Sequence, residues 1–256
     1  MEIELSELLE GKPTIIKNKE YLSTKEYVEP FLDICSPFVE EFTFQVQTPK
    51  QMSLSKDSTD LIYNRVLIQG VLPKEHDYDN HSEVVGFLYG LDTKKPVAKI
   101  YRGYLNRACT NLSVFSPEWL HVQEINPEKE INYNVKDLLN LANNFKNELR
   151  ALKQEFVNRD MIYNHLGKWV DYCLTSSYDN GIYDVKIPHS LPVTAYKSVF
   201  LDKKSIYYRG ETTEVSLFDI HEAMTQVITD GKSDITNRYE KTLMVNDMIN
   251  LIREAL

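Results

Sequence analysis

The sequence lacks the short motifs that most directly identify an enzyme. No G-x-x-x-x-G-K-[ST] or G-x-G-x-x-G stretch occurs among its 256 residues, which excludes nucleotide hydrolysis through a P-loop. No G-x-S-x-G elbow occurs either. Cysteine is scarce, and Cys35, Cys109 and Cys173 form no C-x-x-C pair. Neither a disulfide framework nor a zinc finger is therefore indicated, and a reducing cytosol fits best.

Long apolar runs are also missing. No stretch approaches the roughly 18 consecutive apolar residues that a membrane-spanning helix needs. The N-terminus carries Glu2, Glu4 and Glu7 where a secretory signal would carry lysine or arginine. We therefore expect a cytoplasmic protein that is neither exported nor inserted and has no membrane partner.

The residues that are present predict four strands in the first half of the chain. With 42% hydrophobic and 26% charged residues, the composition is that of an ordinary globular protein. Period-2 alternation and β-branched residues predict strands at 42–47, 61–72, 83–91 and 96–105. Gly86 and Gly90 mark bulges or close backbone approaches. The short polar link at 92–95 predicts a hairpin, so an antiparallel meander is the simplest assembly.

Helical periodicity dominates the second half. The predicted helices cover 135–156, 159–173, 194–200, 216–229 and a last segment that starts at Ser233 or Asp234. A capping-box pattern at 23–26 predicts one earlier helix, kinked or delayed by Pro30, which ends near Ile34.

Together these elements predict an α+β fold, in which an antiparallel β meander is followed by long helices in a single domain. We expect an N-terminal helical segment at 1–38 and one α+β domain at 39–256. Within this domain the strands lie at about 39–112 and the helices at about 135–256.

Charge is distributed unevenly along a chain whose formal net charge is -9. Residues 1–60 carry 6 basic and 12 acidic side chains, residues 211–256 carry 4 and 9, and residues 61–210 carry 19 and 17. The overall charge argues against nonspecific coating of a polyanion but leaves a local basic face open. One such stretch, from Lys94 to Arg107, holds five basic residues and no acidic one.

This acid-free stretch combines cations and tyrosines, which is the combination that single-stranded nucleic acid needs. Cations contact phosphates, and aromatic rings stack on bases at about 1–3 kcal/mol per base. The predicted phosphate contacts are Lys94, Lys95, Lys99, Arg102 and Arg107, and the predicted stacking residues are Tyr101 and Tyr104. Strand alternation places Lys99 and Tyr101 on one face. The alternative interpretation is an edge strand whose lysines discourage pairing and whose tyrosines are half buried.

Histidines and carboxylates crowd the stretch His76-Asp77-Tyr78-Asp79-Asn80-His81. We interpret it as a solvated loop between two strands, because metal ligands are generally fixed by a scaffold. The other four histidines lie far apart in sequence and form no H-E-x-x-H pattern. We expect no metal, no cofactor and no catalytic residue.

Two segments carry a family resemblance. The sequence Arg-Ala-Cys-Thr-Asn-Leu at 107–112 resembles the R-x-C-x-N signature of a phage and plasmid family known as domain of unknown function 932. The stretch 213–229 is similar to that family's late helix, in which an aromatic residue precedes an alanine and a threonine. The resemblance spans roughly 40–250 and implies a protein of a virus or mobile element in the cytoplasm of a bacterial host.

The signature allows two interpretations. Arg107 and Asn111 either contact phosphate or base, or they brace the turn that leaves the sheet, with Cys109 packed as a small hydrophobe.

The leading hypothesis is a phage-encoded, non-enzymatic protein that binds single-stranded nucleic acid, such as single-stranded DNA, in annealing or recombination. The order of strands and long helix is similar to the core of single-strand annealing proteins, which assemble as rings, so a homo-oligomer belongs to this hypothesis. The alternative is a viral protein-binding factor that inhibits a host enzyme or defence system through its acidic surface. A metal-dependent nuclease is a third hypothesis.

Overall fold

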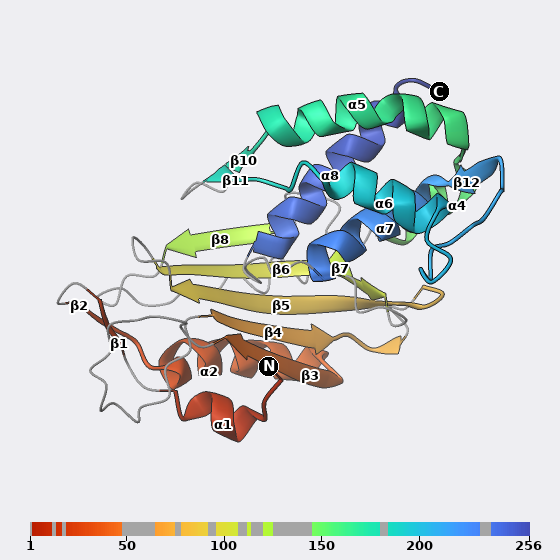
Figure 1. The fold of residues 1–256 in the computed structure, drawn as a ribbon. Helices are drawn as coiled ribbons and strands as arrows, with labels where there is room; N and C mark the ends of the chain where they lie inside the picture. The colour runs from red at the N-terminus through yellow and green to blue at the C-terminus, as the bar shows by residue number, and fades with distance from the viewer. Residues whose placement is uncertain are drawn as a thin grey trace. The chain divides into compact units, whose positions relative to one another are not determined.

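The computed structural model describes residues 2–11, 14–16, 19–47, 65–74, 78–91, 96–106, 112–113, 120–124, 145–179, 184–230 and 237–256. Within these residues the α+β class is confirmed, because an antiparallel meander precedes a series of helices. Figure 1 shows this order of elements.

Contacts divide the chain into two compact units. The first unit comprises 1–77, 82–102 and 118–141, and the second comprises 78–81, 103–117 and 142–256. This division differs from the predicted one, which separates 1–38 from a single domain at 39–256.

The central sheet contains every strand that the sequence predicts. Its strands are β3 (Glu41–Gln47), β4 (Arg65–Val71), β5 (His81–Leu91), β6 (Pro96–Asn106), β7 (Leu112–Ser113) and β8 (Leu120–Glu124). The order is β3-β4-β5-β6-β7, and β8 also pairs with β6 (Figure 1). All the registers that the structure describes are antiparallel, for example Phe42 opposite Gly70 and Phe44 opposite Ile68. The sequence pattern does not predict β8.

In the first unit, α2 (Thr24–Cys35) packs on one face of this sheet. Its predicted capping box is present, since the Glu26 carboxylate accepts hydrogen bonds from the Ser23 backbone N–H and hydroxyl at 2.7 and 2.6 Å. The helix continues through Pro30 to Cys35. Its apolar side joins the strands in one core, whose helix residues include Tyr27, Val28, Phe31 and Leu32.

Smaller elements complete the described part of the first unit. They are α1 (Leu5–Leu9), β1 (Thr14–Ile16), β2 (Lys19–Tyr21) and the 3₁₀ turn η1 (Ser36–Phe38). Gly86 of β5 allows a close approach, because the Tyr101 ring fills the place of a side chain there: a Cβ at this position would lie 1.8 Å from Tyr101 Cζ. The sequence marks Gly86 as a bulge or a close backbone approach; β4 and β5 stay in register across it, and the group that approaches its backbone closely is the Tyr101 side chain.

The second unit is built mostly from helices. Its elements after β7 are α4 (Phe145–Gln154), β9 (Phe156–Asn158), α5 (Arg159–Thr175), β10 (Tyr178–Asp179), β11 (Asp184–Val185), α6 (Leu191–Phe200), β12 (Glu214–Ser216), α7 (Leu217–Asp230) and α8 (Arg238–Arg253). The predicted helices correspond to α4, α5, α6, α7 and α8, although the predicted part at 135–144 lies outside the described residues.

The core of the second unit gathers around Trp169 of α5. This side chain is 1% exposed, and its indole N–H donates to the Met248 carbonyl of α8 at 2.7 Å. Ala195 of α6 and Met224 of α7 belong to the same core. Among the described helices, none is both long enough and apolar enough to span a membrane.

Candidate nucleic-acid interface

Four of the predicted nucleic-acid contacts are buried. Lys99, Tyr101 and Tyr104 are 0% exposed and Arg102 is 4% exposed. β6 is also an interior strand of the sheet, because β5 pairs along one side of it and β8 along the other, where Val122 lies opposite Lys99. Both sequence interpretations of this segment, a basic binding surface and an edge strand, are therefore wrong for these four residues.

Arg102 is engaged by a carboxylate of its own unit. Its guanidinium forms an ion pair with Glu83 of β5, and both side chains are almost completely buried. Buried charges in proteins are typically paired in this way, because an isolated charge is costly to remove from water. Arg102 consequently serves the core of the first unit, and a phosphate cannot reach it.

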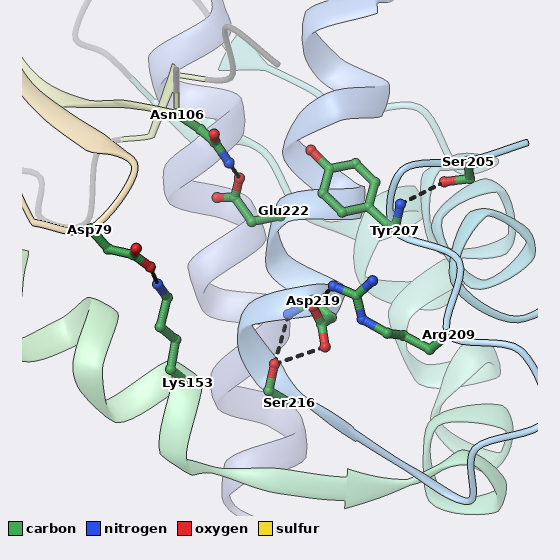
Figure 2. Close-up of polar contacts among 9 residues, drawn as sticks. All are labelled: Asp79, Asn106, Lys153, Ser205, Tyr207, Arg209, Ser216, Asp219 and Glu222. Atoms are coloured by element: carbon green, nitrogen blue, oxygen red, sulfur yellow. Dashed lines mark hydrogen bonds and ion pairs between the residues drawn. The ribbon is translucent and has the colours of Figure 1, made fainter. Parts of the chain in front are cut away.

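Tyr104 and its neighbour Asn106 contact the buried carboxylate of Glu222. Asn106 Nδ2 donates to Glu222 Oε2 at 2.6 Å, and the Tyr104 hydroxyl donates to Oε1 at 3.5 Å. Figure 2 shows the amide of Asn106 directed at this carboxylate from the end of β6. The neighbouring His221 is hydrogen-bonded to Asn246 through Nε2 at 2.9 Å. This network is internal to the second unit and holds α7 against the end of β6.

His81 also departs from its predicted place in a solvated loop. It begins β5, is 2% exposed, and stands edge-on to the rings of Tyr104 and Phe218 at centroid distances of 5.1 and 5.4 Å. Within the described chain, neither of its ring nitrogens has a hydrogen-bond partner. The preceding turn is exposed, and its Asp79 forms an ion pair with Lys153 (Figure 2).

Burial lowers the pKa of His81 below its ordinary value of 6.5. The carboxylates of Glu222 and Asp79 oppose this shift, whereas Lys153 reinforces it.

We expect the lowered pKa of His81 to make the protein less stable in mild acid. The unfolded chain takes up a proton on His81 near pH 6.5 and the folded chain does so only at lower pH, so stability is lost as the pH falls through this window. The measurement is the urea midpoint at about pH 7.5 and about pH 5.5 for the wild type and His81→Phe. His81→Phe should lose less stability than the wild type between these two pH values, and equal losses would contradict a lowered pKa of His81 as the cause.

The remaining predicted contacts, Lys94, Lys95, Arg107 and Asn111, lie outside the described residues. Cys109 of the family signature lies there too. Their proposed contacts with phosphate and base stay predictions.

A second group of side chains, made of one arginine and three aromatic rings, lies at the start of α5. The backbone of this first turn is fixed by contacts with β9 and with the segment before β12. The strands β9 and β12 pair antiparallel and place Asn158 opposite Glu214. Asn158 caps α5 by accepting from the Met161 backbone N–H at 2.7 Å. The backbone N–H of Arg159 donates to the Thr213 carbonyl at 2.9 Å. The first turn of α5 is thereby fixed to the segment that leads into β12.

Arg159 lies over two aromatic rings of α6. Its guanidinium carbon is 5.9 Å from the Tyr196 ring centroid and 5.2 Å from that of Phe200. Its Nε donates to the Tyr196 hydroxyl at 3.1 Å, and this bond raises the pKa of the arginine further above its ordinary value. The guanidinium is consequently a permanent charge held by a fixed partner.

Tyr163, one turn after Arg159 on α5, extends this group into solvent. Its ring centroid is 6.0 Å from that of Tyr196, which in turn is 4.9 Å from that of Phe200. Tyr163 is 63% exposed, whereas Phe200 is buried at 3%. We call Arg159, Tyr163, Tyr196 and Phe200 the aromatic platform. Its Phe200 ring is buried, its Tyr196 ring is half buried, and its Tyr163 ring is exposed.

Exposed cations lie close in sequence to the platform residues Tyr196 and Phe200. Residues 197–209 contain four basic side chains and one acidic one. Lys197, Lys203 and Lys204 are exposed. Arg209 pairs with Asp219 at 2.6 Å, and Asp219 also accepts from the Ser216 hydroxyl at 3.0 Å (Figure 2). The three lysines give this segment a basic character that the chain as a whole lacks.

The sequence carries only a weak signal for this platform. Arg159 and Tyr163 are four residues apart and so share a helix face, but Tyr196 follows far along the chain.

Among the described residues there is no group of three or more His, Cys, Asp or Glu side chains arranged to hold a metal ion.

Comparisons with known proteins add no family. No family model, no curated protein and no solved structure matches this chain. The resemblance to domain of unknown function 932, the bacterial host and the homo-oligomer therefore stay predictions.

Proposed function

We propose that the protein is a non-enzymatic binder of single-stranded nucleic acid, and that the aromatic platform is its contact site. The observation that carries the proposal is the exposed Tyr163 ring beside a guanidinium that Tyr196 holds in place. In this proposal the bases stack on the aromatic platform and not on Tyr101 and Tyr104 of β6, which the sequence pattern indicates for stacking.

Physical chemistry supports a base as the stacking partner. An unpaired base presents an apolar ring face, and stacking on an aromatic side chain is worth about 1–3 kcal/mol per base without regard to sequence. Arginine adds a cation that can stack on a base or pair with a phosphate. A tyrosine that is mostly exposed and an arginine that is preorganised meet both needs with little ordering cost.

The local charge supports a phosphate backbone nearby. Lys197, Lys203 and Lys204 are exposed and lie next to or shortly after Tyr196 and Phe200 in the chain, so they are the proposed phosphate contacts of a strand that stacks on Tyr163. Phosphate contacts release counterions, so binding depends on salt. Lys94 and Lys95 remain proposed as further phosphate contacts.

The test is a fluorescence-anisotropy titration of a labelled oligo-dT strand with the wild type and, separately, with Tyr163→Ala. We expect this change to weaken binding roughly fivefold or more, because one stacking contact is lost. Folding should be unaffected, since the ring is 63% exposed. Arg159→Gln should weaken binding and also reduce its dependence on salt.

Leu174→Ala is the matched control. Leu174 lies at the far end of the same helix and is 59% exposed, so its removal takes away a similar exposed apolar side chain outside the platform. Binding by this variant should equal that of the wild type. A loss as large as that of Tyr163→Ala would show that the platform is not the contact site.

A further inference from the structure

A groove lies on the first unit, between its N-terminal residues and β3. It is lined by Glu2, Ile3, Glu4, Glu7, Phe42, Thr43 and Phe44, and its volume is about 380 Å³. This volume is within the range of about 300–1,000 Å³ that ligand pockets have. The nucleic-acid proposal does not involve this groove, and Ile3, Phe42 and Phe44 of its lining also pack against the core of the unit.

Backbone contacts hold the two walls of the groove together. The Ile3 N–H donates to the Phe44 carbonyl at 3.2 Å, and Glu2 forms an antiparallel bridge with Gln45. Leu8 of α1 is fully buried and belongs to the core of the unit. The groove is therefore formed before any partner arrives.

Aromatic rings and carboxylates line the groove together. Phe42 and Phe44 are stacked, with centroids 6.3 Å apart and planes at 24°. Both rings are only partly buried, and Glu2, Glu4 and Glu7 are exposed. Of the described residues that line the groove, three are glutamates and none is lysine or arginine.

One side-chain chemistry matches both features. A guanidinium is planar and weakly hydrated, so it stacks on an aromatic ring, and its fork of N–H donors fits a carboxylate with two parallel hydrogen bonds. A lysine ammonium can satisfy the charge but neither the stacking nor the fork.

We propose that this groove binds an arginine-containing segment of a protein partner. The charge of the surrounding chain favours such a segment, because residues 1–60 carry 12 acidic and 6 basic side chains. The acidic field steers a basic partner toward the groove, and the two phenylalanines select arginine over lysine. This gives the acidic-surface hypothesis a defined site, and it stands independently of the nucleic-acid proposal.

The test uses a fluorescein-labelled peptide in which arginine alternates with alanine, and its counterpart in which lysine replaces arginine. We expect the arginine peptide to bind the full chain more tightly than the lysine peptide. The triple variant Glu2→Gln/Glu4→Gln/Glu7→Gln should weaken the arginine peptide roughly tenfold. Equal binding of the two peptides to the wild type would overturn the proposal.

A charge-matched variant separates the groove from a diffuse acidic surface. Glu29→Gln/Asp33→Asn/Glu40→Gln removes the same charge from residues of the first unit that do not line the groove. It should leave the arginine peptide bound as in the wild type. An equal loss in both triple variants would overturn the proposal, as would a self-association of the wild type that the groove variant alone abolishes. Far-ultraviolet circular dichroism confirms that each variant is folded.

Discussion

Arg102→Met is expected to destabilise the protein by about 3–5 kcal/mol, because it leaves the Glu83 carboxylate buried without its guanidinium. This cost is a large part of the roughly 5–15 kcal/mol that stabilise a typical native protein. A urea unfolding curve measures it directly. If Arg102 were instead a surface residue that contacts phosphate, Arg102→Met would weaken nucleic-acid binding and leave the unfolding curve unchanged.

Two further variants serve as comparisons for Arg102→Met. Glu83→Leu/Arg102→Met replaces both charges and should recover most of the lost stability, since an apolar pair of similar volume often substitutes for a buried ion pair. Arg209→Met removes a guanidinium whose side chain is 40% exposed, and it should cost below about 1 kcal/mol. A small effect of Arg102→Met, similar to that of Arg209→Met, would contradict the buried pair.

Trp169→Ala is expected to destabilise the second unit by about 3–5 kcal/mol. The substitution leaves a cavity in a core where the indole is 1% exposed, and it removes the hydrogen bond to the Met248 carbonyl. Trp169→Phe keeps most of the packing and should cost less than Trp169→Ala. Urea unfolding of both variants tests this, and an alanine variant within about 1 kcal/mol of the wild type would show that Trp169 is not central to the core.

The elements of this fold could be predicted because their signals are local. The alternation around Phe42 and Phe44 predicts β3, and the Ser23–Glu26 pattern predicts the start of α2. The sequence also indicates a close approach at Gly86, and the Tyr101 ring provides the reason. Each of these inferences needs only residues within one element or its nearest neighbour.

The site could not be predicted in the same way, because it depends on pairing between distant segments. Lys99 and Arg102 have the local pattern of a basic surface, yet β8 joins β6 and Glu83 supplies a partner for Arg102. The short segment at 120–124 gives too weak a pattern to predict that strand. Tyr196 meets Arg159 only because α5 and α6 fold together, which no spacing in the sequence reveals.

The two proposed sites also clarify the uneven charge of the chain. Residues 197–209 begin next to Tyr196 of the aromatic platform, include its Phe200, and hold four basic residues and one acidic one, whereas the groove lies within the acidic residues 1–60. A net charge of -9 is therefore compatible with two binding sites of opposite preference, each set by the charges near it.

The central claim is tested most directly by titrating a labelled oligo-dT strand with the wild type and Tyr163→Ala at about 50 and about 200 mM salt. We expect the wild type to bind at the lower salt, to bind more weakly at the higher salt, and to exceed Tyr163→Ala roughly fivefold or more in affinity. Absence of wild-type binding at the lower salt, or equal affinity of the two proteins, would contradict the assignment of the aromatic platform as a nucleic-acid interface.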